Sequence, residues 1–413
     1  MKKSYKQLKA ACYSTNISMS IVANLSPILF LTFHNLYGIS FSLLGTLVLI
    51  NFVTQLGIDL IFSFFSHKFN IPKVVKITPL LTFIGLVLYA VLPLLFPQHA
   101  YAGLVAGTII FSASGGFAEV LISPTIAAIP SPDPDKEMSK LHSVYAWGVV
   151  PVIIISTFYI LAFGQSNWQW LALGFAVIPL ISFFLFMKSE IPPMQTPEKM
   201  SGALKMLKNK WLWLMVTAIF LGGAAECIMA QWSSGYIEQA LGIPKIFGDV
   251  FGVTLFSVML GLGRTLYAKK GKKIGNVLFS GAIGATICYL TAAISNNPVI
   301  GLIACAFTGL CVSMLWPGSL IVASDRFPTG GVFIFAMMAA GGDMGAAAGP
   351  QLIGVITDFV IENPQLLTLA EKLSLAPEQL GMKAGMLVGM LFPLLAIPVY
   401  LTIKKSRKET LRK

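Results

Sequence analysis

The sequence predicts an all-α membrane protein, with twelve transmembrane helices in two pseudo-symmetric six-helix bundles. Of its 413 residues, 56% are hydrophobic and only 11% are charged, which is too little charge to cover the surface of a soluble protein of this length. The apolar residues form uncharged runs, such as 77–95, 168–187 and 275–294. A run of about 18 residues or more crosses a ~30 Å hydrocarbon core as a helix. These runs lack the period-two alternation of a transmembrane barrel.

Twelve apolar stretches define the expected spans. They cover residues 11–36, 41–66, 74–96, 100–129, 141–164, 168–187, 211–238, 247–268, 274–295, 298–324, 329–360 and 382–403. Because several are longer than a bilayer requires, tilted or kinked helices are expected.

The basic residues mark one side of the membrane. Of the 29 lysines and arginines, only Lys245, Lys372 and Lys383 belong to one side, and the others fall at the termini or around the alternate loops. This bias places both termini in the cytoplasm, and it explains the net charge of +12 without a nucleic-acid partner. We therefore expect a multi-pass protein of a bacterial cytoplasmic (inner) membrane.

This topology predicts which single cysteines are accessible from outside. A cysteine in place of Lys372 should react with an impermeant maleimide added to intact cells. A cysteine in place of Lys199 should stay protected, because its loop is expected to be cytoplasmic. Labelling in the opposite pattern would reverse the topology.

The chain is expected to divide into an N-terminal bundle (1–187), a cytoplasmic linker (188–210) and a C-terminal bundle (211–413). In the linker, Thr196 and Pro197 begin an expected amphipathic helix that lies on the membrane surface. Identities at an offset of 204 residues relate the halves, pairing Gly38, Phe52, Leu56 and Gly57 with Gly242, Phe256, Leu260 and Gly261. Such weak internal repeats are typical of secondary transporters.

Three acidic residues lie deep within the expected spans: Glu119 in the fourth, Glu226 in the seventh and Asp343 in the eleventh. Each would cost roughly 2.5–3.5 kcal/mol as a charge at the bilayer centre, so we expect them to face a polar cavity or to be protonated. All three are candidates for proton coupling. The alternative is a protonated acid that joins two helices by a hydrogen bond.

Polar and aromatic residues within the spans are candidates for solute binding: Asn24, Asn51, Gln55, Tyr145, Trp147, Glu226, Gln231, Trp232 and Trp316. Amides and carboxylates suit the hydroxyl groups of a sugar and aromatic faces suit its C–H surface, although a single aromatic residue more often serves packing. Asp59 and Arg264, which lie near the cytoplasmic ends of their spans, are interpreted as an inner gate. Plain interfacial charge is the alternative.

Judged by position in the sequence, no Lys or Arg is expected to lie as deep in the membrane as the three acids. Phosphate esters, nitrate and carboxylates generally require a cationic side chain, so neutral polyols or cations remain as solutes.

Other motifs are few. Asn363-Pro364 predicts the start of a short helix in the longest external loop. The sequence carries no His/Cys set with metal-ligand spacing, no phosphate-binding loop and no nucleophile motif, so we expect neither a cofactor, nor a metal, nor enzyme activity.

Two levels of family resemblance follow from particular motifs. Segments 57–68 and 261–273 occupy the places of a conserved loop of the major facilitator superfamily, which the whole chain resembles, although the first lacks that loop's usual Asp-Arg and Gly-Arg pairs. Segments 115–119, 123–124 and 141–145 (GGFAE, SP and LHSVY) look like the fucose–galactose–glucose:proton symporter group. That group carries Asn where Ser123 stands here. Its fucose type also has an acid on the first span, where this chain has Asn24 and Pro27 instead. The resemblance implies that Glu119 is the protonated residue.

These features predict a secondary active transporter that moves a neutral, sugar-like solute together with protons by alternating access. Proton-antiport efflux of hydrophobic or cationic compounds is the alternative, because buried acids and aromatic rings also fit it. A membrane-embedded solute sensor or enzyme is a further alternative, and coupling to sodium stays open. The protein is expected to be monomeric, with the solute, protons and the lipid bilayer as its partners.

Overall fold

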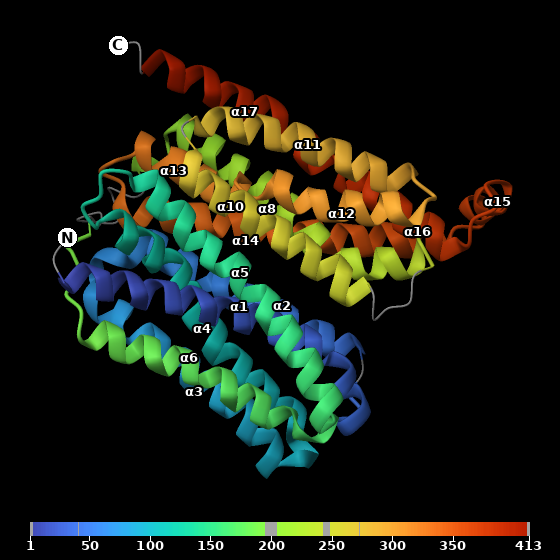
Figure 1. Ribbon diagram of the computed structural model, residues 1–413, viewed down its shortest axis with the longest axis horizontal. Helices are drawn as coiled ribbons and strands as arrows, with labels where there is room; N and C mark the ends of the chain where they lie inside the picture. Colours follow the sequence, from blue (N-terminus) through green and yellow to red (C-terminus); the bar gives the residue numbers. More distant parts are fainter. Residues whose placement is uncertain (1–2, 40, 195–204, 243–247, 272, 411–413) are drawn as a thin grey trace. The chain divides into compact units, whose positions relative to one another are not determined.

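The chain is almost entirely helical (Figure 1). The computed structural model describes residues 3–39, 41–194, 205–242, 248–271 and 273–410. Two compact units are present: Met1–Asn209 with Ser324–Ala340, and Lys210–Ala323 with Gly341–Lys413. The break at Asn209 lies at the end of the expected linker, and the bundle limits 1–187 and 211–413 stay a prediction. The helix expected from Thr196 lies outside the described residues.

The twelve expected spans are confirmed. Eleven stretches are long and apolar enough to cross a membrane, and the 35-residue helix α1 precedes them. The first six spans are α1 (Lys3–Tyr37), α2 (Phe41–Phe65), α3 (Ile71–Leu95), α4 (Ala100–Ala127), α5 (Pro134–Phe163) and α6 (Trp168–Met187).

The other six spans include three interrupted ones. They are α8 (Lys210–Gln239), a π-helical turn (Gly248–Val253) leading into α10 (Thr254–Lys270), α11 (Ile274–Ile294), α12 (Pro298–Val312) with α13 (Leu315–Arg326), α14 (Gly331–Glu362), and α16 (Pro377–Gly389) with α17 (Leu391–Thr410). The interruption between α12 and α13 is used by the site described below.

Several helices begin with an Asn or Asp cap followed by proline. Asn70, Asp133, Asn297 and Asn363 each accept a hydrogen bond from a backbone N–H of the first turn of α3, α5, α12 and α15 (Pro364–Lys372), respectively. Proline fits there because the first-turn N–H groups have no partner within the helix. The short helix expected after Asn363 is thereby confirmed, and its docking on the membrane or over a cavity stays a prediction.

The core of the first unit is aromatic and closely packed. Phe33 and Trp168 meet edge to face with ring centroids 4.9 Å apart, and the Tyr89 ring lies 5.7 Å from that of Trp168. A Cβ at Gly107 would lie 2.6 Å from the Tyr89 backbone, so glycine is required where α3 and α4 touch. Ser26 and Tyr89 share a buried hydrogen bond of 2.8 Å between their hydroxyl groups, which ties α1 to α3.

Tyrosines join the helices of the second unit. Tyr289 and Tyr400 donate from their hydroxyl groups to backbone carbonyls of α8, at 2.7 and 2.9 Å. Tyr236 of α8 donates in turn to the Ala292 carbonyl of α11 at 2.7 Å. These buried hydroxyls fix α8, which carries Glu226, against α11 and α17.

Candidate functional site in the membrane helices

One face of α4 carries a polar stripe. Ser112 donates to the Asn51 side chain of α2 at 2.6 Å, and Gly115 faces Gln55, whose Oε1 would lie 3.2 Å from a Cβ at that glycine. Glu119 is one turn beyond Gly115 and therefore on the same face. The structure thus places two predicted binding residues, Asn51 and Gln55, along the seam that leads to the predicted proton carrier.

The stripe continues to α5. Ser123 stands one turn beyond Glu119, and its hydroxyl is 3.4 Å from Nε2 of His142. Glu119 itself is only partly buried, as a residue that exchanges protons must be. His142 lies in the segment 141–145, and its contact with Ser123 joins it to the stripe.

A second polar seam joins α1 to α5. Asn16 donates to the Leu141 carbonyl at 2.9 Å, and Gly148 lies directly against the Ser20 hydroxyl. Asn24, one turn further along α1, donates to the Ser20 carbonyl at 2.8 Å. The role of Asn24 in solute binding stays a prediction. On α5, Tyr145 is partly buried and Trp147 is 39% exposed.

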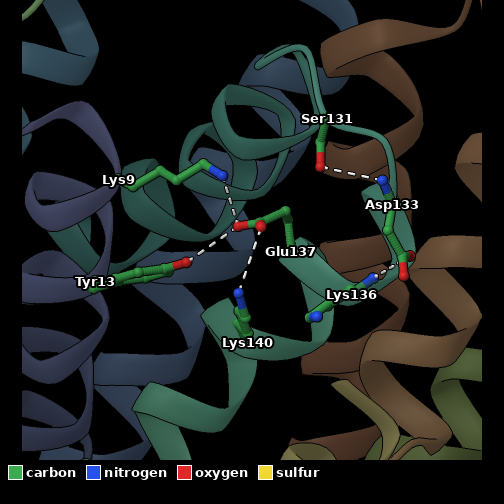
Figure 2. A network of polar contacts seen from close by, with 7 residues as sticks. All are labelled: Lys9, Tyr13, Ser131, Asp133, Lys136, Glu137 and Lys140. Carbon is green, nitrogen blue, oxygen red and sulfur yellow. Dashed lines mark hydrogen bonds and ion pairs between the residues drawn. The ribbon is translucent and has the colours of Figure 1, made fainter. Parts of the chain in front are cut away.

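An ionic cluster also joins α1 to α5, at the first turns of α5 (Figure 2). The Glu137 carboxylate lies 2.8 Å from Lys9 Nζ of α1 and 3.5 Å from Lys140 Nζ, and it accepts a 3.4 Å hydrogen bond from the Tyr13 hydroxyl. Beside it, Asp133 caps α5 through the N–H of Lys136 at 3.1 Å. The sequence offered no indication of this cluster, because Lys9 and Glu137 are far apart in the chain.

Glu137→Gln is expected to lower the unfolding free energy by about 1–3 kcal/mol, since Lys9 is only 11% exposed and would lose its counter-charge. Lys140→Gln is the matched control. Its side chain is 44% exposed, so a loss below about 1 kcal/mol is expected. Melting of the purified variants in detergent measures both, and equal losses would contradict this ranking.

In the second unit, Glu226 forms a buried ion pair with Arg264. Arg264 Nη2 donates to both carboxylate oxygens, at 2.7 and 2.9 Å. The arginine is 2% exposed and the glutamate 8%. This corrects the expectation that no cation reaches the depth of the acids. The backbone of Arg264 lies six residues before the end of α10. Its long side chain extends to Glu226, in the middle of α8.

The break between α12 and α13 explains how the arginine is held. Pro317 has no N–H, so it cannot donate to the carbonyl four residues earlier, at Ser313. Arg264 Nε donates to that carbonyl instead, at 2.9 Å. Two of the guanidinium nitrogens are thereby oriented inside the second unit, and the gate role expected for Arg264 stays a prediction. Asp59 is fully buried in α2, and its gate role stays a prediction.

Trp316 lies next to this pair. Its ring packs on Gly223 of α8 and Gly342 of α14, where any side chain would collide with it. Gly223 is one turn before Glu226, and Gly342 directly precedes Asp343, which is 5% exposed. The ring of Trp316 is itself partly exposed. The structure therefore brings the predicted residues Glu226, Trp316 and Asp343 into one region of the second unit.

Two predicted binding residues lie away from this region. Trp232 donates its indole N–H to the Pro350 carbonyl at 3.0 Å and packs against Gly354, so its polar atom serves the contact between α8 and α14. Gln231 is exposed. Both remain solute-binding residues by prediction only.

Comparison with known proteins identifies the family. The family model for the Major Facilitator Superfamily matches residues 11–350. The chain belongs to the major facilitator superfamily. No curated protein sequence matches significantly.

Solved structures of superfamily members share the fold at low sequence identity. The Escherichia coli fucose:proton symporter (N162A variant) superposes with a TM-score of 0.72 at 14% identity, over 95% of this chain and 99% of that one. The proton:xylose symporter bound to 6-bromo-6-deoxy-D-glucose gives 0.74 at 14%, over 96% and 94%. The human organic anion transporter MFSD10 gives 0.67 at 12%, over 96% and 99%.

Proposed function

We propose that this superfamily member is a proton-coupled symporter of a small, sugar-like solute that works by alternating access. The observation that carries the proposal is the polar stripe of α4, in which Glu119 lies between groups that bond Asn51 and His142. A membrane helix does not present an acid among amide and hydroxyl groups to lipid, because each such group is costly there. The stripe suits a solute with many hydroxyl groups and a proton that travels with it.

Similar structures support this function. Two of them are proton symporters for fucose and xylose by their titles, and a third is an organic anion transporter. The fold is therefore compatible with neutral and anionic solutes. Efflux of cations is less well supported, because Arg264 already occupies both carboxylate oxygens of Glu226, the acid that would otherwise attract a cation in this region. The exclusion of anionic solutes from the sequence depended on the absence of a cation at this depth, and Arg264 removes that ground.

Reconstituted vesicles test the function. Purified protein in sodium-free proteoliposomes, acidic outside, should accumulate a radiolabelled hexose, pentose or sugar acid above its equilibrium level. A protonophore should abolish the accumulation. If no member of such a panel accumulates, and a hydrophobic dye is instead expelled in exchange for protons, the efflux alternative is correct.

A further inference from the structure

We propose that Arg264 binds the carboxylate of the transported solute, which replaces Glu226 on the guanidinium when Glu226 is protonated. This rests on the proposed function and narrows its solute to a class: sugar acids with one carboxylate. The site lies wholly within the second unit, among α8, α10, α13 and the portion of α14 that begins at Gly341.

The exchangeable position is the Nη2 edge of the guanidinium. Nε is already bonded to the Ser313 carbonyl, which has no other helical donor because of Pro317. Nη2 donates to both carboxylate oxygens of Glu226. The Glu226 side chain is 11% exposed against 2% for Arg264, so the acid covers the more open side of the pair. A second carboxylate could reach Nη2 from the side that Glu226 now occupies.

Charge balance makes the exchange depend on a proton. Arginine stays protonated at any accessible pH, and a buried cation without a counter-charge is strongly unfavourable. When Glu226 takes up a proton, its negative charge beside Arg264 is lost, and a solute carboxylate restores that charge. Proton binding and carboxylate binding therefore favour each other, as linkage requires. A neutral hexose has no group that can take the place of the charged carboxylate.

The surroundings fit a sugar ring beside a carboxylate. Trp316 lies one turn from Ser313, and its ring contacts Gly223, one turn from Glu226. An aromatic face can cover the C–H surface of a sugar while Nη2 of the guanidinium donates to the acid group, as it now donates to Glu226.

Three other ionisable side chains pack near Glu226. Tyr289 of α11 and Tyr400 of α17 are committed to backbone carbonyls of α8. Asp343 of α14 is buried beside Gly342, and it is the acid within the chain that could serve Arg264 in place of a solute. The test therefore includes it.

D-Glucuronate and D-glucose are the probes, since they differ only in a carboxylate against a hydroxymethyl group. Calorimetric titration of the purified protein should show glucuronate binding that strengthens by up to about tenfold per unit fall in pH, as expected for one linked proton. Glu226→Gln should bind glucuronate more tightly than the wild type and should lose the part of the pH dependence that the Glu226 proton contributes. The double variant Glu226→Gln/Arg264→Gln, which keeps an uncharged pair in the core, should lose at least about tenfold in glucuronate affinity.

Other results overturn the proposal. If Glu226→Gln weakens glucuronate binding, the acid is a direct ligand and is not displaced. If Asp343→Asn rather than Glu226→Gln produces the gain, the exchangeable partner is Asp343. If vesicles accumulate glucose along the pH gradient and glucuronate neither binds nor competes, this inference fails while the proposed function stands. If glucuronate binds as described but nothing accumulates, the proposed function fails instead.

Discussion

Replacing Glu119 by Gln is expected to abolish accumulation of solute against its gradient. The amide imitates the protonated acid permanently, so the solute can still bind and exchange, but no proton is released to drive the cycle. Uptake along a pH gradient should fall to passive equilibration, while counterflow exchange between preloaded vesicles and medium should persist. Both are measured with the same labelled solute in the same vesicles.

Glu190→Gln is the matched control for this prediction. Glu190 is an exposed acid just after α6, so its neutralisation should change neither accumulation nor exchange. If Glu119→Gln accumulates solute at the wild-type rate along a pH gradient, its assignment as the proton carrier is wrong. Asp343 then becomes the leading candidate.

Glu226→Leu is expected to lower the unfolding free energy by about 3–5 kcal/mol, because it removes the carboxylate that neutralises the buried Arg264 guanidinium. The purified variant should melt far below the wild type in detergent, measured by the loss of the monodisperse species on size exclusion. Glu226→Gln should lose less, since its amide oxygen still accepts a hydrogen bond from Nη2.

A double variant separates the charge from the packing. Glu226→Leu/Arg264→Met replaces the ion pair by apolar side chains of similar size, and such replacements are often neutral or stabilising. It should therefore recover most of the stability lost by Glu226→Leu while it remains unable to bind glucuronate. A double variant as unstable as the single one would mean that shape, and not charge, makes Glu226 necessary.

The sequence was sufficient for features that depend on local order. Uncharged runs predicted all twelve spans, because in lipid a helix satisfies its own backbone and leaves few other structures possible. Asn363-Pro364 predicted α15 for a similarly local reason: the cap accepts from N–H groups two and three residues away. Internal acids were recognised because a charge within an apolar run is rare and costly.

Pairings between helices could not be read in the same way. Glu226 and Arg264 are 38 residues apart, and the depth of Arg264 was inferred from its Cα position, although its side chain reaches several ångströms along the helix. One indication was available: Pro317 leaves the Ser313 carbonyl without a donor. The bond of Ser123 to His142 and the cluster around Glu137 likewise depend on which helices become neighbours.

The order of Glu226 and Arg264 along the chain also bears on synthesis. An arginine at the centre of an isolated helix costs roughly 2.5–3.5 kcal/mol to insert, and α10 is among the less apolar of the spans, with a mean hydropathy of 1.3. Glu226 is made first and is already in the bilayer on α8 when α10 leaves the insertion machinery. The acid can therefore neutralise the arginine as it enters, before α12 and its Ser313 carbonyl exist, so that this weakly apolar span meets a partner on the span made immediately before it.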